Sequence, residues 1–432
     1  MQSRRSILGA LTGTGLAMLN PSSFASVVRS LASFAQQGGS DIASDEQFWL
    51  HIQDAFDVDR SIINLNNGGV SPAPRVVMES LRQAMEYSNT APSYTMWRHQ
   101  EPNIELIRSQ LAAMFAADSE EIAITRNASE SLETLQLGID LKRGDEVITT
   151  TQDYPRMLTT WDQRARRDGV IITKVDYPVP LLNHDDYVER IASAITPRTR
   201  IIHISHVCFM TGQILPVRRI TDLARAKNIV CIVDGAHAFA QFPFTRAELG
   251  CDYYGCSLHK WLYGPIGTGF LYIQKDLIKN VWSLMASPKD MESNIRKFEE
   301  IGTHPAALHN ALGAAVMFNQ SLTLERKAAR YRHLHNIWTE RLSHYDNVKY
   351  MSNLADTRNW CGMITVNIEG TDLNKLQTYL FEKHRIFTVG ITHEQFKGLR
   401  ITPAVYTRAA DMHHFADVME RVAQGKISEV KA

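Results

Sequence analysis

The sequence lacks the features that mark several protein classes. Its 432 residues include only five cysteines and no CxxC pair, which is too few for a disulfide scaffold. We expect these cysteines to be small core residues, although an exported protein could still form one disulfide. Lysine plus arginine balance aspartate plus glutamate at 46 each, so no excess charge points to nucleic acid or to an anionic membrane. Internal repeats and low-complexity stretches are also absent, and the expected partner is a small molecule.

The length predicts two domains, because domains tend to split beyond about 250 to 300 residues. Short apolar runs alternate with amphipathic stretches over much of the chain, which indicates an α/β domain with a mostly parallel sheet buried on both faces. The seven runs are residues 121–125, 146–150, 170–175, 200–204, 229–233, 253–256 and 269–273. We assign this large domain, with the segment that precedes it, to residues 36–305.

The pattern changes near Pro305. Residues 306–347 are expected to form a long connecting helix, and residues 348–432 a smaller α+β domain. In this C-terminal part, strand-like stretches at 363–368 and 399–402 alternate with helical stretches at 372–383 and 409–424.

Residues 1–35 are interpreted as an export signal. Arg4 and Arg5 precede a modestly apolar stretch at residues 7–19, the layout of a signal for the Tat translocase. Ser-Phe-Ala triplets end at Ala25 and at Ala35, and either could mark the cleavage site. The alternatives are a frayed helix or a membrane anchor, but the stretch is shorter than the about 20 residues that a spanning helix needs. We therefore predict a periplasmic protein.

The segment most informative about chemistry is residues 255–269, GCSLHKWLYGPIGTG, which holds Lys260 between a strand and a glycine-rich turn. A lysine in a rigid, partly desolvated place can have a lowered pKa and act as a nucleophilic amine. A lysine on a loose surface loop cannot.

The Ser-x-His-Lys sequence followed by Gly-Pro-x-Gly resembles the class V aminotransferases, which are pyridoxal 5'-phosphate (PLP) enzymes of fold type I. The resemblance covers most of the chain, from about Asn64 to Ile401, and implies that Lys260 is catalytic and carries the cofactor as a Schiff base. The stretches at residues 153–157 and 234–237 are most similar to the isopenicillin N epimerase-like branch.

Asp234 and His237 follow the apolar run 229–233. A carboxylate at the carboxyl end of a strand could pair with the pyridine nitrogen of the cofactor and keep it protonated. The alternative for Asp234 is a helix N-cap. His237 could donate a hydrogen bond to the phenolic oxygen of the cofactor.

The phosphate is expected at a strand end that turns into a helix, where backbone N–H groups and the helix dipole favour an anion. The resemblance places Ala128 and Ser129 closest to it, with further donors from Ser257 and His259. An ordinary capping segment is the alternative reading of residues 125–131.

The remaining cofactor contacts also come from the resemblance. Tyr154 would stack on the pyridine ring, unless it is a core tyrosine. Ser205 and His206 would face the other side of the ring. Thr303 would reach the phosphate of a neighbouring subunit, which implies a homodimer. We predict no metal ligand.

The resemblance also implies the substrate-binding residues, which are Arg400, at the position of the family's carboxylate-binding arginine, and Asn67. The planar guanidinium of Arg400 fits an α-carboxylate with two hydrogen bonds, which lysine cannot reproduce. A surface arginine is the alternative, although Arg400 has apolar neighbours on both sides in the sequence.

Three functional hypotheses remain from the sequence. The first is an exported PLP enzyme that transforms the amino group of an amino acid or glutamyl moiety by transamination or oxidative removal. Exported PLP enzymes are few, and the chain resembles a periplasmic kind that modifies a glutamate side chain of a maturing pyoverdine siderophore. The second is an epimerase or C-S lyase of the same fold, and the third a non-catalytic binding protein that has kept the fold. Cys361, in Trp360-Cys361-Gly362, looks structural, which argues against desulfuration.

Overall fold

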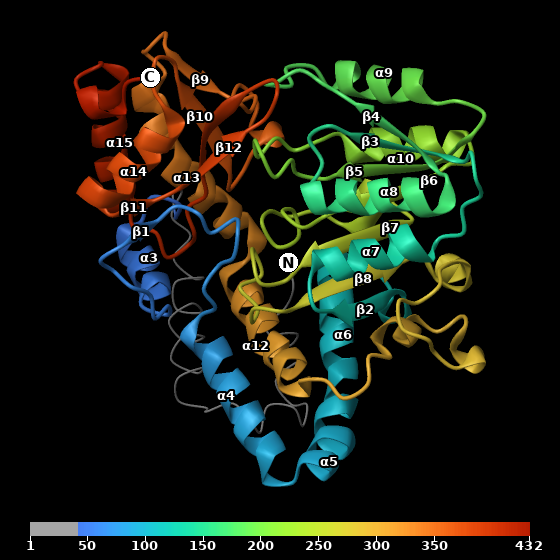
Figure 1. The fold of residues 1–432 in the computed structure, drawn as a ribbon. Coiled ribbons are helices and arrows are strands. Elements are labelled where there is room, and N and C mark those ends of the chain that lie inside the picture. The colour runs from blue at the N-terminus through green and yellow to red at the C-terminus, as the bar shows by residue number, and fades with distance from the viewer. Residues whose placement is uncertain (1–41) are drawn as a thin grey trace.

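The computed structural model describes residues 42–432, so the predicted export signal lies outside the described part. The centre of the fold is a seven-stranded sheet with the order β2-β8-β7-β6-β5-β3-β4 (Figure 1). Its strands are β2 (Ile122–Thr125), β3 (Glu146–Thr150), β4 (Ile171–Val175), β5 (Thr199–Ser205), β6 (Val230–Asp234), β7 (Tyr253–Ser257) and β8 (Gly269–Ile273). In this sheet β8 pairs antiparallel with both β2 and β7, and all other strand pairs are parallel. The predicted mostly parallel sheet is confirmed.

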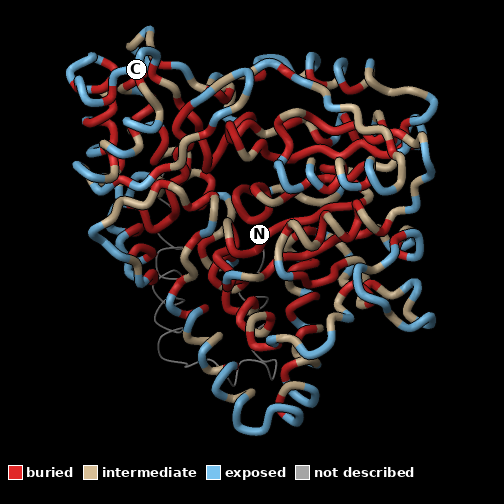
Figure 2. The backbone as a smooth tube through the Cα atoms, viewed as in Figure 1, coloured by how far each residue is buried: buried red, intermediate tan, exposed pale blue. Residues whose placement is uncertain are grey.

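Successive strand residues enter two different cores, because neighbouring side chains of a strand point to opposite faces. Val147 and Ile201 pack beneath α7 (Ala128–Gly138) and α8 (Pro155–Asp168). The next residues, Ile148 and Ile202, belong to the core on the other face. That second face is covered by helices α6 (Glu101–Phe115), α9 (His184–Ala194) and α10 (Val217–Ala226). Figure 2 shows the consequence: the sheet is buried, and the exposed residues lie on the surrounding helices and loops.

The C-terminal part forms a second sheet with the order β12-β13-β10-β9, in which all pairs are antiparallel. Its strands are β9 (Val348–Tyr350), β10 (Ile364–Ile368), β12 (Val389–Thr392) and β13 (Lys397–Ile401). Helices α14 (Leu373–His384) and α15 (Ala409–Ala423) share a core with this sheet. A smaller α+β domain is therefore present.

The N-terminal segment contacts this smaller domain. After α3 (Glu46–Gln53), the short strand β1 (Ile63–Asn64) pairs in parallel with β11 (Ile386–Phe387). Leu65 is buried in the small-domain core. Residues 63–67, which the sequence assigned with the large domain, thus complete the small one.

Two helices occupy the predicted connecting stretch instead of one. They are α12 (Ala306–Leu322) and α13 (Leu324–Leu342), separated by Thr323 with a φ of 65°. The side chain of Thr323 accepts a hydrogen bond from the Arg326 amide and so caps α13. Helices α4 (Arg75–Thr90) and α5 (Pro92–Thr95) project with the start of α6 at one end of the molecule (Figure 1). No helix in residues 42–432 is long and apolar enough to cross a membrane.

Candidate active site

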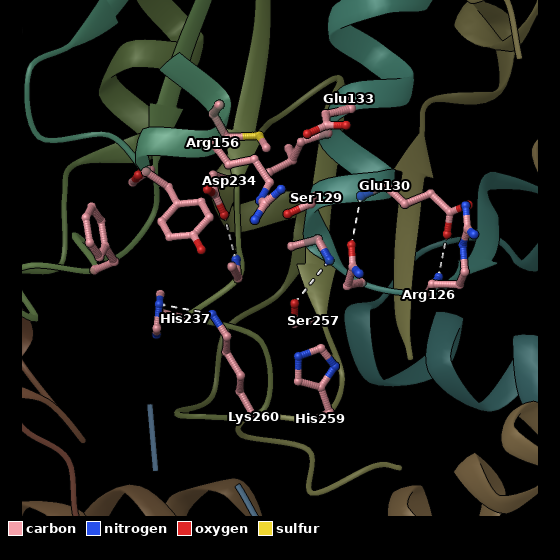
Figure 3. A pocket seen from close by; sticks show the side chains of 18 of the residues that line it. Arg126, Ser129, Glu130, Glu133, Arg156, Asp234, His237, Ser257, His259 and Lys260 are labelled. Carbon is pink, nitrogen blue, oxygen red and sulfur yellow. Dashed lines mark hydrogen bonds and ion pairs between the residues drawn. The ribbon is translucent and has the colours of Figure 1, made fainter. Parts of the chain in front are cut away.

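A cavity of about 620 Å³ lies where several elements of the large domain end (Figure 3). Ser205, Asp234 and Ser257, the last residues of β5, β6 and β7, line it together with the first turn of α7. The carboxyl ends of parallel strands meet at one edge of the sheet, which is where α/β proteins bind ligands. The cavity brings together nine of the predicted cofactor and catalytic residues: Ala128, Ser129, Tyr154, Ser205, Asp234, His237, Ser257, His259 and Lys260.

Lys260 and His237 are in direct contact in this cavity. Nζ of Lys260 lies 3.1 Å from Nε2 of His237 (Figure 3). Burial lowers the pKa of Lys260 from 10.5 to about 8, although the Asp234 carboxylate opposes this shift. Burial and the charges of Lys260 and Arg400 hold the pKa of His237 well below 6.5. His237 is therefore neutral, and its ring can exchange a hydrogen bond with the Lys260 amine.

Asp234 is a buried carboxylate with few donors. One carboxylate oxygen accepts from the backbone N–H of Ala236 at 2.9 Å, so the residue also caps the turn that follows β6. Burial raises the pKa of Asp234 from 3.8 to about 6, although the Ala236 N–H and the charge of Lys260 oppose this. A cationic N–H inside the cavity would satisfy this carboxylate.

The start of α7 offers donors for an anion. Asn127 caps the helix through a hydrogen bond from the Glu130 amide, and the Ala128 amide donates to Oγ of Ser257 at 3.0 Å. The Ser129 amide lies in the first turn, where helix N–H groups have no intrahelical acceptor. His259 Nδ1 lies 3.1 Å from the Thr268 carbonyl, an acceptor, so this nitrogen carries the hydrogen and Nε2 remains for another partner.

Asp153 organises the turn that presents Tyr154, and sequence reasoning missed this role. Its Oδ2 accepts from the Thr150 amide at 2.7 Å and from two threonine hydroxyls, while Oδ1 accepts from the amide and hydroxyl of Ser205. Tyr154, at the N-cap of α8, stands edge-on to Phe209 with 5.2 Å between ring centroids. The aromatic face at the cavity is thus fixed by a buried carboxylate.

His206 does not belong to the cavity, which corrects the predicted cofactor contact. Its ring packs edge-on against Phe242 and Phe244, and burial lowers the pKa of His206 to about 3. The reason is the alternation of side chains at the end of β5, where Ser205 points to the cavity and its successor to the opposite side.

Arg400 is 6% exposed and forms no ion pair in the described part of the chain. Its Nη1 donates to the Phe209 carbonyl at 2.8 Å and its Nη2 to Oδ1 of Asn66 at 3.0 Å, while Nε has no partner. Burial lowers the pKa of Arg400 from 12.5 to about 10. Arg400 is not among the residues that line the cavity, but its charge lowers the pKa of Lys260 and His237, which places it within electrostatic range.

Asn67, predicted to bind substrate, has a structural role instead. Its amide donates to the carbonyls of Asn64 and Thr402 and accepts from the Tyr406 hydroxyl at 2.6 Å. These contacts tie the segment after β1 to the end of β13. The neighbouring Asn66 contacts Arg400, and the sequence carried no signal that distinguished the two asparagines.

Thr303 is exposed and does not line the cavity of its own chain, so its predicted contact with a neighbouring subunit stays a prediction. All five cysteines are buried and none lines the cavity. Burial raises the pKa of Cys361 to about 12, which leaves its thiol unreactive.

The donors and acceptors of the cavity fit PLP. Asp234 would hold the pyridine nitrogen, Tyr154 the ring face, and Ser129, Ser257 and His259 the phosphate. His237, whose Nδ1 is buried without a partner, would lie between the phenolic oxygen and Lys260. Val70, Phe209 and Leu284 also line the cavity and were not foreseen, because apolar wall residues in loops carry no motif.

Comparisons with known proteins point to one protein family. Residues 63–393 match the sequence profile described as Aminotransferase class-V. The chain is 26% identical to isopenicillin N epimerase of Amycolatopsis lactamdurans over 394 residues, 87% of this chain and 99% of the relative. It is 24% identical to a cysteine desulfurase of Haloferax volcanii over 371 residues, 81% of this chain and 84% of the relative.

Solved structures share the fold. The apo cysteine desulfurase of Thermococcus onnurineus NA1 has a TM-score of 0.76 at 21% identity, covering 87% of this chain and 98% of that one. The cystine C-S lyase C-DES, in complex with its product cysteine persulfide, has a TM-score of 0.74 at 22% identity, covering 84% and 98%.

Proposed function

The chain belongs to the aminotransferase class V family and is a PLP-dependent enzyme, and from this premise we propose that it transforms the amino group of an amino acid or glutamyl moiety. The observation that carries the proposal is the 3.1 Å contact between Lys260 Nζ and His237 Nε2 beside a buried Asp234. When bound, the cofactor draws electrons from the bonds at the amine-bearing carbon of the substrate.

The other steps of the reaction depend on side chains of the protein. Lys260, with a pKa lowered to about 8, has an amine that can accept and return a proton near neutral pH. His237 stays neutral and holds that amine by a hydrogen bond. Arg400, whose buried charge lacks a carboxylate partner, supports the binding of a substrate carboxylate. Transamination or oxidative removal of the amine is the reaction we propose.

The first experiment separates this function from a binding protein that has only the fold. Purified protein reconstituted with PLP should show a visible absorption band that borohydride bleaches. Mass spectrometry should then find the reduced cofactor on the peptide that contains Lys260. A protein that stays colourless, or a label on another lysine, would contradict the proposal.

The second experiment decides the reaction. The holoenzyme is incubated with single L-amino acids and glutamyl peptides, and the products are identified by mass spectrometry and chiral chromatography. Transamination or oxidative removal predicts a keto or shortened acid product. An inverted stereocentre without loss of the amine would instead establish an epimerase, and release of a sulfur species a C-S lyase.

Epimerisation and C-S cleavage are the second candidate function, because the relatives carry those names. Desulfuration through a cysteine nucleophile has less support, since all five cysteines are buried outside the cavity.

We also propose that the enzyme is exported by the Tat translocase and acts in the periplasm on the glutamate side chain of a maturing pyoverdine. Arg4-Arg5 and the following apolar stretch support export, because the Tat system moves folded proteins that already hold their cofactor. Replacing both arginines with lysine should retain the protein in the cytoplasm, and N-terminal sequencing should find cleavage after Ala25 or Ala35. In a pyoverdine producer, a deletion strain with a normal siderophore mass would remove the substrate hypothesis.

We propose that the active unit is a homodimer in which Thr303 reaches the partner's site. Val70 and Leu284 line the cavity and have exposed apolar side chains. Clustered apolar side chains on a surface mark interaction sites, which supports a partner subunit that covers the cavity entrance. Light scattering should give twice the chain mass. A Thr303→Ala dimer with unchanged affinity for the cofactor would contradict the role of Thr303.

A further inference from the structure

A second lysine, Lys327, lies fully buried beneath the loop that carries Lys260. It belongs to α13, and its side chain is 0% exposed. Its Nζ donates to the backbone carbonyl of Trp261 and, at 2.7 Å, to Oδ1 of Asn319. Nζ also lies 4.2 Å from the centroid of the Tyr263 ring. The contacts of Lys327 within residues 42–432 include no carboxylate.

These contacts suit a group that only donates. An ammonium has three N–H donors and no acceptor, and here it meets two carbonyl oxygens and the face of an aromatic ring. Burial lowers the pKa of Lys327 well below 10.5, and only the charge of the nearby Cys361 thiolate form would oppose that shift. In either charge state the side chain is a donor to the Lys260 loop.

Lys327 and Asn319 together satisfy two carbonyls that directly follow Lys260. Nδ2 of Asn319 donates to the Leu262 carbonyl at 2.7 Å, next to the Trp261 carbonyl that Lys327 holds. No backbone N–H in the described part of the chain donates to either carbonyl. A buried carbonyl without a donor is costly, so the loop depends on these two side chains for its conformation.

The next residue, Tyr263, has a backbone conformation that needs support. Its φ is 60°, a region that residues other than glycine seldom adopt, and such strain persists only where the surroundings enforce it. The Tyr263 hydroxyl lies 2.6 Å from the hydroxyl of Tyr331 on α13 and accepts from the Val405 amide at 3.1 Å. Val405 follows β13, the strand that carries Arg400.

We propose that Lys327 and Asn319 are positioning residues that fix the Lys260 loop and couple it to the small domain. Neither lines the cavity, so both act through Lys260 rather than on the substrate. Helix α13 leads from the large domain into the small one. Its contacts with the Lys260 loop therefore keep the amine of Lys260 at a fixed position relative to the guanidinium of Arg400. The inference rests on the role of Lys260 proposed above.

The test uses Lys327→Met, which keeps the length of the side chain and removes its donors. Cofactor-free protein is labelled with a trace of acetic anhydride over a range of pH, and the peptide that contains Lys260 is quantified by mass spectrometry. We expect the apparent pKa of the Lys260 amine to rise by about one unit, since a loosened loop exposes the amine to water. On addition of PLP, the visible band should form roughly tenfold more slowly, the effect of one lost buried hydrogen bond on a positioned amine.

Lys297→Met is the matched control. Lys297 is also buried, donates to the carbonyls of Ile278 at 2.8 Å and Glu292 at 2.9 Å, and lies 5.0 Å from the Phe298 ring centroid. It does not line the cavity. The control should lose thermal stability to a similar extent while the pKa and band formation of Lys260 stay as in the wild type. Equal effects of both variants on Lys260, or no effect of either, would overturn the proposal.

A softer variant decides the matter if Lys327→Met does not fold. Tyr331→Phe removes one hydroxyl from the Tyr263 pair, and we expect band formation to slow by roughly threefold, less than the loss of a full buried hydrogen bond. An unchanged rate would then overturn the proposal. A wild-type protein that forms no band would refute the PLP function instead, whereas the labelling experiment needs no cofactor and still tests the positioning of Lys260.

Discussion

Replacing Arg400 with lysine tests whether this buried cation binds a substrate carboxylate. The guanidinium has five N–H donors, of which the Phe209 carbonyl and the Asn66 amide oxygen each take one. The pKa of Arg400, lowered from 12.5 to about 10 by burial, corresponds to roughly 3 kcal/mol of uncompensated desolvation in the free protein. A bound carboxylate would offset that cost.

Lysine offers only three N–H donors. If two of them keep the contacts to Phe209 and Asn66, one remains for the carboxylate in place of a two-pronged grip. The loss of one charge-assisted hydrogen bond, about 1.5 to 3 kcal/mol, predicts a decrease in kcat/KM of roughly 10- to 150-fold. The affinity for the cofactor should change by less than about twofold, because no cofactor contact is expected at Arg400.

The assay compares an amino acid with the matching amine that lacks the carboxylate. Arg400→Lys should penalise the amino acid and leave the amine unaffected. Arg341→Lys, on the outer side of α13 in ion pairs with Asp417 and Glu420, is the control and should behave as the wild type. An equal loss for both substrates, or an equal loss of cofactor affinity, would show that Arg400 has another role.

Three further predictions follow from the site. Lys260→Ala should abolish turnover and borohydride fixation of the cofactor while circular dichroism stays unchanged; full activity would contradict the assignment. Asp234→Asn should raise the Tm of the cofactor-free protein at pH 8 and have little effect near pH 4.5. The pKa of Asp234 is raised from 3.8 to about 6, so the wild-type protein loses roughly 3 kcal/mol of stability as pH rises through 6. A pH-independent Tm difference would contradict this. Asn66→Ala should raise KM without lowering Tm much, whereas Asn67→Ala should lower Tm, since its amide joins two segments; the reverse pattern would restore Asn67 to the substrate site.

The sequence predicted the central sheet well because its strands are apolar runs buried on both faces. All seven runs became strands within a residue or two, and Lys260, Asp234 and Tyr154 meet in one cavity. Residues at the carboxyl ends of parallel strands lie at one edge of the sheet regardless of loop conformation. The order of the motifs in the sequence was therefore enough to place these residues in one site.

The sequence could not place contacts that depend on side-chain direction or on distant segments. The sequence predicts a cofactor contact for His206, but this residue directly follows Ser205, the last residue of β5, and adjacent residues of an extended chain face opposite sides. The sequence predicts Asn67 as a substrate-binding residue, but only the folded loop shows that the amide of the neighbouring Asn66 meets Arg400. The two-residue strands β1 and β11 are too short to leave a pattern, and the helix break at Thr323 carries neither proline nor glycine.

The pairing of β1 with β11 has a consequence for the order in which the protein can be built. Ile63 leaves the ribosome more than three hundred residues before Ile386, its partner. At a synthesis rate of about 5 to 20 residues per second, β1 remains unpaired for roughly 15 to 65 s until β11 has been made. The small domain therefore closes only when synthesis is almost complete, and a prematurely terminated chain would leave Leu65 without its core.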